Sequence, residues 1–242
     1  SAWPTPPERL SETVDRLRGP KYMGFNITIP HKEQLLDLVD EVDEMARSIG
    51  AVNTVVNREG TLSGYNTDAY GFVKSLKEKA SFDPLGKTVL LLGAGGAARA
   101  AAYALAAEGV ERLTIANRTV ARAKALAEDV GRLLPNVHVS SLQNVSGDAD
   151  LIVNSTSVGM ASGDGAGQTP LGADSIPENA LAYDMVYTPA ETPFLRCAQE
   201  AGARVVGGLW MLIYQGASSF ELWSGKDAPV DVMYQAAQQA IE

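Results

Sequence analysis

The chain has 242 residues, 45% hydrophobic and 20% charged, a balance ordinary for a globular protein and long enough for one large or two modest domains. Its formal net charge is −9 and no basic stripe is present, which argues against nucleic acid and anionic membrane surfaces as partners. A single cysteine excludes an internal disulfide, and two histidines in no ligand spacing argue against a zinc site.

The sequence carries no recognisable targeting or membrane segment. Its first residues lack the charged and apolar regions of a signal peptide. The longest apolar stretch, residues 88–107, contains Arg99 and clustered glycines, so it is not expected to span a membrane. We therefore expect a cytoplasmic protein.

A helix and a strand open the chain. Residues Thr5–Glu8 have the pattern of a capping box, with proline in the first turn. Apolar residues then recur at helical spacing at Leu10, Val14 and Leu17. Residues 24–29 predict a short strand, and Pro30 is expected to begin a second helix.

A hairpin and a longer helix follow. Residues 52–56 and 61–65 predict two strands around a turn at residues 57–60. Asn66–Asp68 is expected to cap the next helix, and Asp83–Gly86 has the composition of a linker turn.

Residues 88–92 predict a buried strand that turns through glycines directly into an Ala-rich helix. Gly93 allows a tight turn, while Gly95 and Gly96 let the backbone approach a phosphate. Ala98 is small enough for the helix to close on the strand, and the helix N-terminus offers N–H groups to an anion. The segment predicts a dinucleotide site; the alternative is a Gly-rich turn with a structural role only.

The end of the next predicted strand, residues 112–116, indicates which dinucleotide binds. An NAD site usually carries a carboxylate there to bind the ribose 2′-hydroxyl, whereas this chain has Asn117 followed by Arg118 and Arg122. Guanidinium groups attract a 2′-phosphate, so the pattern favours NADP over NAD. The alternative is that both arginines are simply solvated.

From residue 87 onward, strands and helices alternate, which predicts an α/β fold with a parallel sheet and helices on both faces. The expected strands are 88–92, 112–116, 137–140, 151–154, 181–185 and 204–206, and the expected helices are 96–108, 119–134 and 192–201. The tail from residue 209 predicts two amphipathic helices, the second after Pro229.

Three polar residues outside the nucleotide region are candidates for chemistry. Lys32 falls in the first turn of a predicted helix, an unfavourable place for a cation, and Asp68 stands at another helix start where it could pair with an ammonium. Asn53 lies in a short polar segment between them. The alternative is a surface lysine, a turn-forming asparagine and a helix-capping aspartate.

Eight segments of the chain, taken together, are more specific than any one of them: Phe25–Lys32, Gly50–Thr54, Gly64–Asp68, Gly93–Arg99, Asn117–Thr119, Asn154–Gly159, Tyr183–Tyr187 and Gly208–Gln215. In this order they resemble the shikimate dehydrogenase family over nearly the whole chain. The resemblance implies an oxidoreductase with NADP(H) as cofactor, which reduces 3-dehydroshikimate reversibly to shikimate in aromatic amino-acid biosynthesis. It also implies a small-molecule substrate and a monomer or homodimer.

The resemblance further implies two lobes with the active site in the cleft between them. A smaller α/β substrate-binding domain would comprise residues 1–70, joined by a connecting helix and linker, 71–85, to a Rossmann-like NADP-binding domain, 86–207. Helices in residues 208–242 would return to the substrate domain.

Residue roles follow from the same resemblance. Lys32 and Asp68 match the catalytic pair, in which the lysine passes a proton to the oxygen of the reduced ketone. The substrate-binding positions are Thr28, Asn53, Tyr187 and Gln215. The cofactor-binding positions are Gly93, Ala94, Gly95, Gly96, Ala97, Asn117, Arg118, Thr119, Arg122, Thr156, Met185, Gly208 and Met211.

The chain departs from the family pattern in two places. The family begins with a strand and a Ser-x-Ser motif that bind the substrate carboxylate, and the sequence starts after that point. Trp210 stands where many relatives have a small residue, so it either reshapes the rim of the pocket or packs outward. The alternatives are therefore a quinate/shikimate dehydrogenase of broader specificity and a non-catalytic NADP-binding relative.

Overall fold

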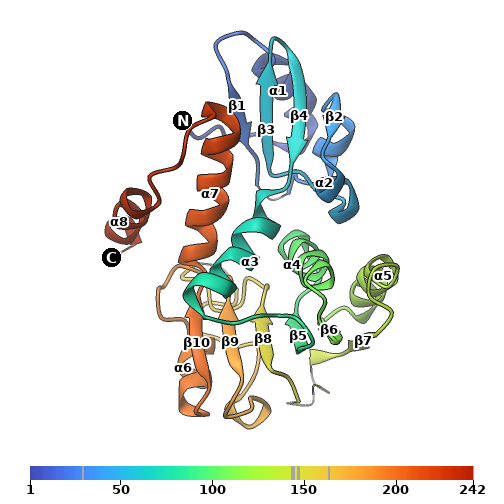
Figure 1. The fold of residues 1–242 in the computed structure, drawn as a ribbon, viewed down its shortest axis with the longest axis vertical. Helices are drawn as coiled ribbons and strands as arrows, with labels where there is room; N and C mark the ends of the chain where they lie inside the picture. The colour runs from blue at the N-terminus through green and yellow to red at the C-terminus, as the bar shows by residue number, and fades with distance from the viewer. Residues whose placement is uncertain (29, 143–144, 146–147, 163, 242) are drawn as a thin grey trace.

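The computed structural model describes every residue except 29, 143–144, 146–147, 163 and 242. Two β-sheets lie at opposite ends of the molecule, and two packed helices, α3 (Thr67–Lys79) and α7 (Leu209–Ser224), run between them (Figure 1). Within the described residues, no helix has the length and apolar character that crossing a bilayer requires.

The smaller sheet is built from the N-terminal part of the chain. Its four strands have the order β1-β3-β4-β2 and are β1 (Gly24–Asn26), β2 (Glu41–Val42), β3 (Thr54–Arg58) and β4 (Thr61–Tyr65). The expected hairpin is confirmed, because β3 and β4 pair antiparallel around a turn in which Gly60 has a positive φ of 92°. Helix α1 (Leu10–Leu17) covers the sheet through Leu10 and Val14, which share a core with Val55.

Two local expectations for this region are wrong, and two elements were not predicted. The helix expected after Pro30 is only a 3-10 turn, Gln34–Asp37, because the Lys32 carbonyl accepts a hydrogen bond from the Val52 N–H at 2.9 Å instead of joining a helical ladder. The expected capping box does not form: no side chain caps the 3-10 turn Pro7–Arg9. Strand β2 and helix α2 (Glu44–Ile49) were not expected at all.

The larger sheet contains six parallel strands in the order β10-β9-β8-β5-β6-β7. They are β5 (Thr88–Leu92), β6 (Arg112–Ala116), β7 (Val137–Ser140), β8 (Leu151–Asn154), β9 (Leu181–Asp184) and β10 (Arg204–Gly207). The order in which the strands are added to the sheet reverses between β5 and β8, the point at which sheets of this kind bind ligands. The expected strands are confirmed, apart from single residues at their ends.

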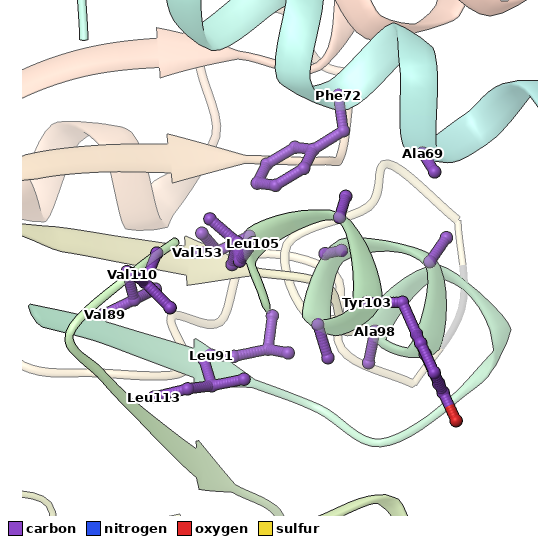
Figure 2. Close-up of a cluster of buried hydrophobic side chains, with 14 of the residues drawn as sticks. Ala69, Phe72, Val89, Leu91, Ala98, Tyr103, Leu105, Val110, Leu113 and Val153 are labelled. Atoms are coloured by element: carbon purple, nitrogen blue, oxygen red, sulfur yellow. The ribbon is translucent and has the colours of Figure 1, made fainter. Parts of the chain in front are cut away.

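Helices cover both faces of this sheet, as the alternation predicts. Helix α4 (Gly96–Ala107), α5 (Val120–Val130) and α3 lie on one face, and α6 (Pro193–Glu200) lies on the other. Figure 2 shows Phe72 of α3 pointing into the cluster formed by α4 and the sheet. Phe72 also packs edge to face on Tyr183, with 5.2 Å between ring centroids, which ties α3 firmly to the larger sheet.

The C-terminal helix α8 (Val230–Ile241) lies against α7. Trp210 of α7 stacks on Tyr234 of α8 at 3.9 Å between centroids, and the Lys79 Nζ lies 3.7 Å from the centroid of the Trp210 ring. Trp210 therefore packs outward onto α8, and the alternative that it shapes the pocket rim is not supported.

Candidate active site

A cavity of about 380 Å³ lies between the two sheets, and we refer to it as the central cavity. Its lining combines the smaller sheet, the start of α3, the start of α7 and the carboxyl edge of the larger sheet. The structure brings ten of the expected site residues to its wall: Thr28, Lys32, Asn53, Asp68, Ala97, Met185, Tyr187, Gly208, Met211 and Gln215.

Lys32 and Asp68 form an ion pair on this wall. The Lys32 Nζ lies 2.6 Å from Asp68 Oδ2, and the two side chains are only 16% and 11% exposed. Two local features support the pair. Asn66 caps the start of α3 with its side chain, which orients Asp68, and the Val52 N–H fixes the backbone at Lys32. An ammonium with N–H bonds free to turn toward the cavity can hold or release a proton there.

Asn53 fixes the other oxygen of the aspartate. Its Nδ2 donates to Asp68 Oδ1 at 2.9 Å, and its Oδ1 accepts from the Thr67 N–H at 2.7 Å. The Nδ2 also lies 3.4 Å from Gln215 Oε1, which joins α7 to the same network. Because Asn53 is 2% exposed and bonded through both of its side-chain ends, its orientation is fixed before any ligand binds.

A layer of hydroxyl and amide groups beneath Asn53 was not predicted. The Asn26 Nδ2 donates to Thr54 Oγ1 at 2.9 Å and to Ser219 Oγ at 3.1 Å, and Thr54 also contacts Thr67 at 3.0 Å. The only sequence signal for this layer was the run of polar residues at strand ends. Ser219 could not be predicted, because it is distant in the sequence from the residues that it contacts. This layer supports Asn53 from below.

The Gly-rich turn presents backbone rather than side chains. Gly93 has φ of 115°, and a Cβ there would lie 2.6 Å from Ser155 Oγ, so only glycine fits. A Cβ on Gly95 or Gly96 would meet nothing within 4 Å, so this side of the turn faces open space. No side chain caps α4, and its first N–H groups are therefore available to an anion such as a pyrophosphate.

The remaining expected cofactor residues lie along the same edge, after the ends of β6 and β8. The Asn117 Nδ2 donates to the Thr119 carbonyl at 2.9 Å, which shapes the turn into α5, and Arg118 and Arg122 are exposed beside it. No carboxylate occupies the end of β6, so these residues fit a phosphorylated ribose better than a free 2′-hydroxyl. Thr156 donates to Asn154 Oδ1 at 2.7 Å.

A buried carboxyl group, which sequence reasoning missed, holds the neighbouring loops. Asp184 is fully buried and accepts hydrogen bonds from Thr192 Oγ1 at 2.6 Å, Asn154 Nδ2 at 2.9 Å and the Val186 N–H at 3.0 Å. Burial raises the pKa of Asp184 to about 6, against the opposing effect of these donors. The carboxyl group thus ties the loop of Thr156 to the loop that carries Met185 and Tyr187.

Comparison with known proteins identifies the family to which this arrangement belongs. Three family models match the chain: the shikimate dehydrogenase substrate binding domain over residues 1–55, shikimate / quinate 5-dehydrogenase over residues 76–161 and the shikimate 5′-dehydrogenase C-terminal domain over residues 208–238. The shikimate dehydrogenase (NADP(+)) of Methanopyrus kandleri is 44% identical over 99% of this chain and 84% of its own length. The chain belongs to the shikimate dehydrogenase family.

Solved structures of the shikimate dehydrogenase family share its fold. The shikimate 5-dehydrogenase of Thermus thermophilus, in complex with NADP(H) and shikimate, is 43% identical and superposes with a TM-score of 0.88, over 99% of this chain and 87% of that one. A quinate dehydrogenase of Corynebacterium glutamicum in complex with NAD is 32% identical, with the same TM-score, over 95% of this chain and 82% of that one. The two-lobed α/β fold with a Rossmann-like sheet is therefore confirmed.

Proposed function

We propose that the chain is an NADP-dependent shikimate dehydrogenase, which reduces 3-dehydroshikimate reversibly to shikimate. The observation that carries the proposal is the Lys32–Asp68 ion pair on the wall of a cavity that also contains Ala97 from the Gly-rich segment. A proton donor and the Gly-rich turn expected to bind the dinucleotide thus line the same cavity. We place the reaction in the cytoplasm, in the biosynthesis of aromatic amino acids.

The residues on the larger sheet fit NADP(H). The uncapped start of α4 and the open side of Gly95 would hold the pyrophosphate, and Arg118 and Arg122 would hold the 2′-phosphate. Met185, Gly208 and Met211 line the central cavity and would flank the nicotinamide. When bound, NADPH supplies the hydride.

Lys32 supplies the proton. Hydride transfer to the ketone carbon leaves an alkoxide, and a Lys32 N–H within hydrogen-bond reach donates its proton to that oxygen and becomes a neutral amine. The amine regains a proton from solvent, and in the reverse direction it accepts the proton of the substrate hydroxyl. Asp68 keeps its hydrogen bond to Nζ throughout and so holds the lysine in place.

The ring of the substrate would meet polar side chains on the wall of the central cavity. Thr28, Asn53 and Gln215 converge on the cavity from the smaller sheet and α7, and Tyr187 enters from the loop after β9. We assign the first three to the hydroxyl groups and Tyr187 to the region of the carboxylate. Residues 1–70 and 208–242 then form the substrate side, and residues 86–207 the cofactor side.

The test is the absorbance at 340 nm of the purified chain with shikimate and NADP⁺, followed by quinate and NAD⁺ in each combination. Formation of NADPH that depends on shikimate is expected. Faster turnover of quinate would replace the proposal with a quinate/shikimate dehydrogenase. If NADP⁺ binds in calorimetry but no substrate turns over, the chain is a non-catalytic NADP-binding protein.

A further inference from the structure

Arg99 makes a direct bond between the two sides of the central cavity. It stands on α4, one turn beyond the Gly-rich segment, and its Nε donates to the Ile49 carbonyl at 2.8 Å. Ile49 is the last residue of α2, which belongs to the smaller-sheet side of the molecule. Figure 1 shows α2 directly across from α4, on the side of the molecule away from α7.

Neighbouring groups on both sides hold the contact between Arg99 and Ile49 in place. The Ile49 carbonyl is at a helix C-terminus, where carbonyl groups lack helical partners and the helix dipole favours a cation. Gly50 follows in the left-handed region with φ of 73°, and a Cβ there would lie 3.1 Å from Arg99 Nη2. The Arg99 Nη1 is held from behind by Asp129 of α5 at 3.0 Å, so the guanidinium has little freedom.

The segment that follows Ile49, Gly50–Asn53, contacts each part of the catalytic pair. The Val52 N–H donates to the Lys32 carbonyl at 2.9 Å, and the Ala51 carbonyl accepts from Asn66, the cap of the helix that carries Asp68. The side chain of Asn53 donates to Asp68 itself. A shift of this segment would therefore move both Lys32 and Asp68.

We propose that Arg99 is a positioning residue, which holds the segment Gly50–Asn53, and with it Lys32 and Asp68, at a fixed distance from the cofactor turn. This inference rests on the proposed function for its effect on rate. The hydride and the proton come from opposite sides of the cavity. The reacting atoms are therefore within reach of one another only when the two sides are held at the correct separation and orientation. A displacement of about 1 Å can cost on the order of 100-fold in rate.

The test compares Arg99→Met, which keeps the length of the side chain and loses the guanidinium, with Arg112→Met. Arg112 is a matched control on the same domain, because it also bonds an aspartate and a backbone carbonyl, both of Asp148, and it lies far from the cavity at the start of β6. For Arg99→Met we expect kcat to fall about tenfold and the primary deuterium isotope effect with NADPH deuterated at the transferred position to rise. The dissociation constants of NADP⁺ and of shikimate, each measured alone, should stay within about twofold, because Arg99 is not among the residues proposed to bind either ligand.

Arg99→Lys should restore part of kcat, because an ammonium retains the charge but not the fork of donors. A higher NADP⁺ dissociation constant with unchanged kcat would overturn the proposal and make Arg99 a phosphate-binding charge. A lower Tm with unchanged kcat and isotope effect would overturn it in favour of a merely structural role.

A second measurement does not depend on activity. Hydrogen–deuterium exchange of the ligand-free protein should be faster over residues 46–56 in Arg99→Met than in the unmodified chain, and unchanged there in Arg112→Met. Equal exchange in all three proteins would overturn the inference. If the unmodified chain shows no turnover of shikimate while this exchange difference is present, the proposed function fails and the link between the two sides stands.

Discussion

The two sides of the central cavity differ in how their polar groups are arranged. On the smaller-sheet side, Lys32, Asp68 and Asn53 bond to one another through side chains that are mostly buried. On the larger-sheet side, Gly95 presents bare backbone to open space and Arg118 is exposed. Changes on the first side should therefore affect catalysis and folding together, while changes at exposed residues of the second, such as Arg118, should affect cofactor affinity alone.

The largest effect is expected at Lys32. Lys32→Ala removes the proposed proton donor, so turnover should fall by about 100-fold or more, while the dissociation constant for NADP⁺ stays nearly unchanged. Steady-state kinetics and calorimetry measure the two quantities. Lys226→Ala removes an exposed lysine after α7 and serves as the control. Unchanged turnover in Lys32→Ala would remove the residue from the mechanism.

Asn53→Ala should show the coupling of folding and catalysis on the smaller-sheet side. The change leaves the buried N–H of Thr67 without its acceptor, which costs about 1–3 kcal/mol in the free energy of unfolding. Asp68 also loses a donor, so turnover should fall as well. Urea unfolding and kinetics give both values. Asn136→Ala is a matched control at an exposed asparagine, and an equal loss of stability there would contradict the argument.

Arg118→Ala tests the larger-sheet side. Loss of a charge-assisted bond to the 2′-phosphate should raise the dissociation constant of NADP⁺ about tenfold or more and leave that of NAD⁺ nearly unchanged. The melting temperature should not change, because the side chain is exposed. Equal weakening of both cofactors would show that the arginine does not distinguish them.

The smallest effect is expected for Asp184→Asn, which should change how the free energy of unfolding depends on pH. Its pKa is raised to about 6 by burial, above the unfolded value of 3.8, so the folded protein binds more protons than the unfolded chain between these values. The free energy of unfolding should therefore fall as pH rises from about 4 to about 6. Asp184→Asn should flatten this slope in urea titrations, whereas Asp174→Asn, at an exposed carboxyl, should retain it.

Sequence reasoning located the larger sheet well because its pattern is local. Buried runs such as residues 88–92, followed by glycines and an Ala-rich helix, determine strand, turn and helix without help from distant residues. The prediction was wrong at residues 30–37. The expected helix does not form there, because the Lys32 carbonyl accepts a hydrogen bond from the Val52 N–H. No local pattern reveals a partner twenty residues away.

The candidate site divides in the same way. Motifs and resemblance led to Lys32, Asp68 and the Gly-rich turn, and the structure brings the lysine and aspartate into contact. Ser219, Asp184 and the bridging role of Arg99 were out of reach, because each depends on side chains that meet only after the chain has folded.

The course of α7 has a consequence for biosynthesis of the chain. Trp223 donates from its indole to the Val55 carbonyl at 2.8 Å, and Ser219 contacts Thr54 at 2.9 Å. The smaller sheet therefore leaves the ribosome before the larger sheet but is completed by a helix that follows the larger sheet. At roughly 5–20 residues per second, β3 waits on the order of ten seconds or longer for these partners. All strands of the six-stranded sheet are synthesised before α7, so this sheet can fold first. The smaller sheet can then pack against it once α7 is available. A fragment ending before residue 209 should accordingly be cut by protease within residues 24–65 sooner than the whole chain.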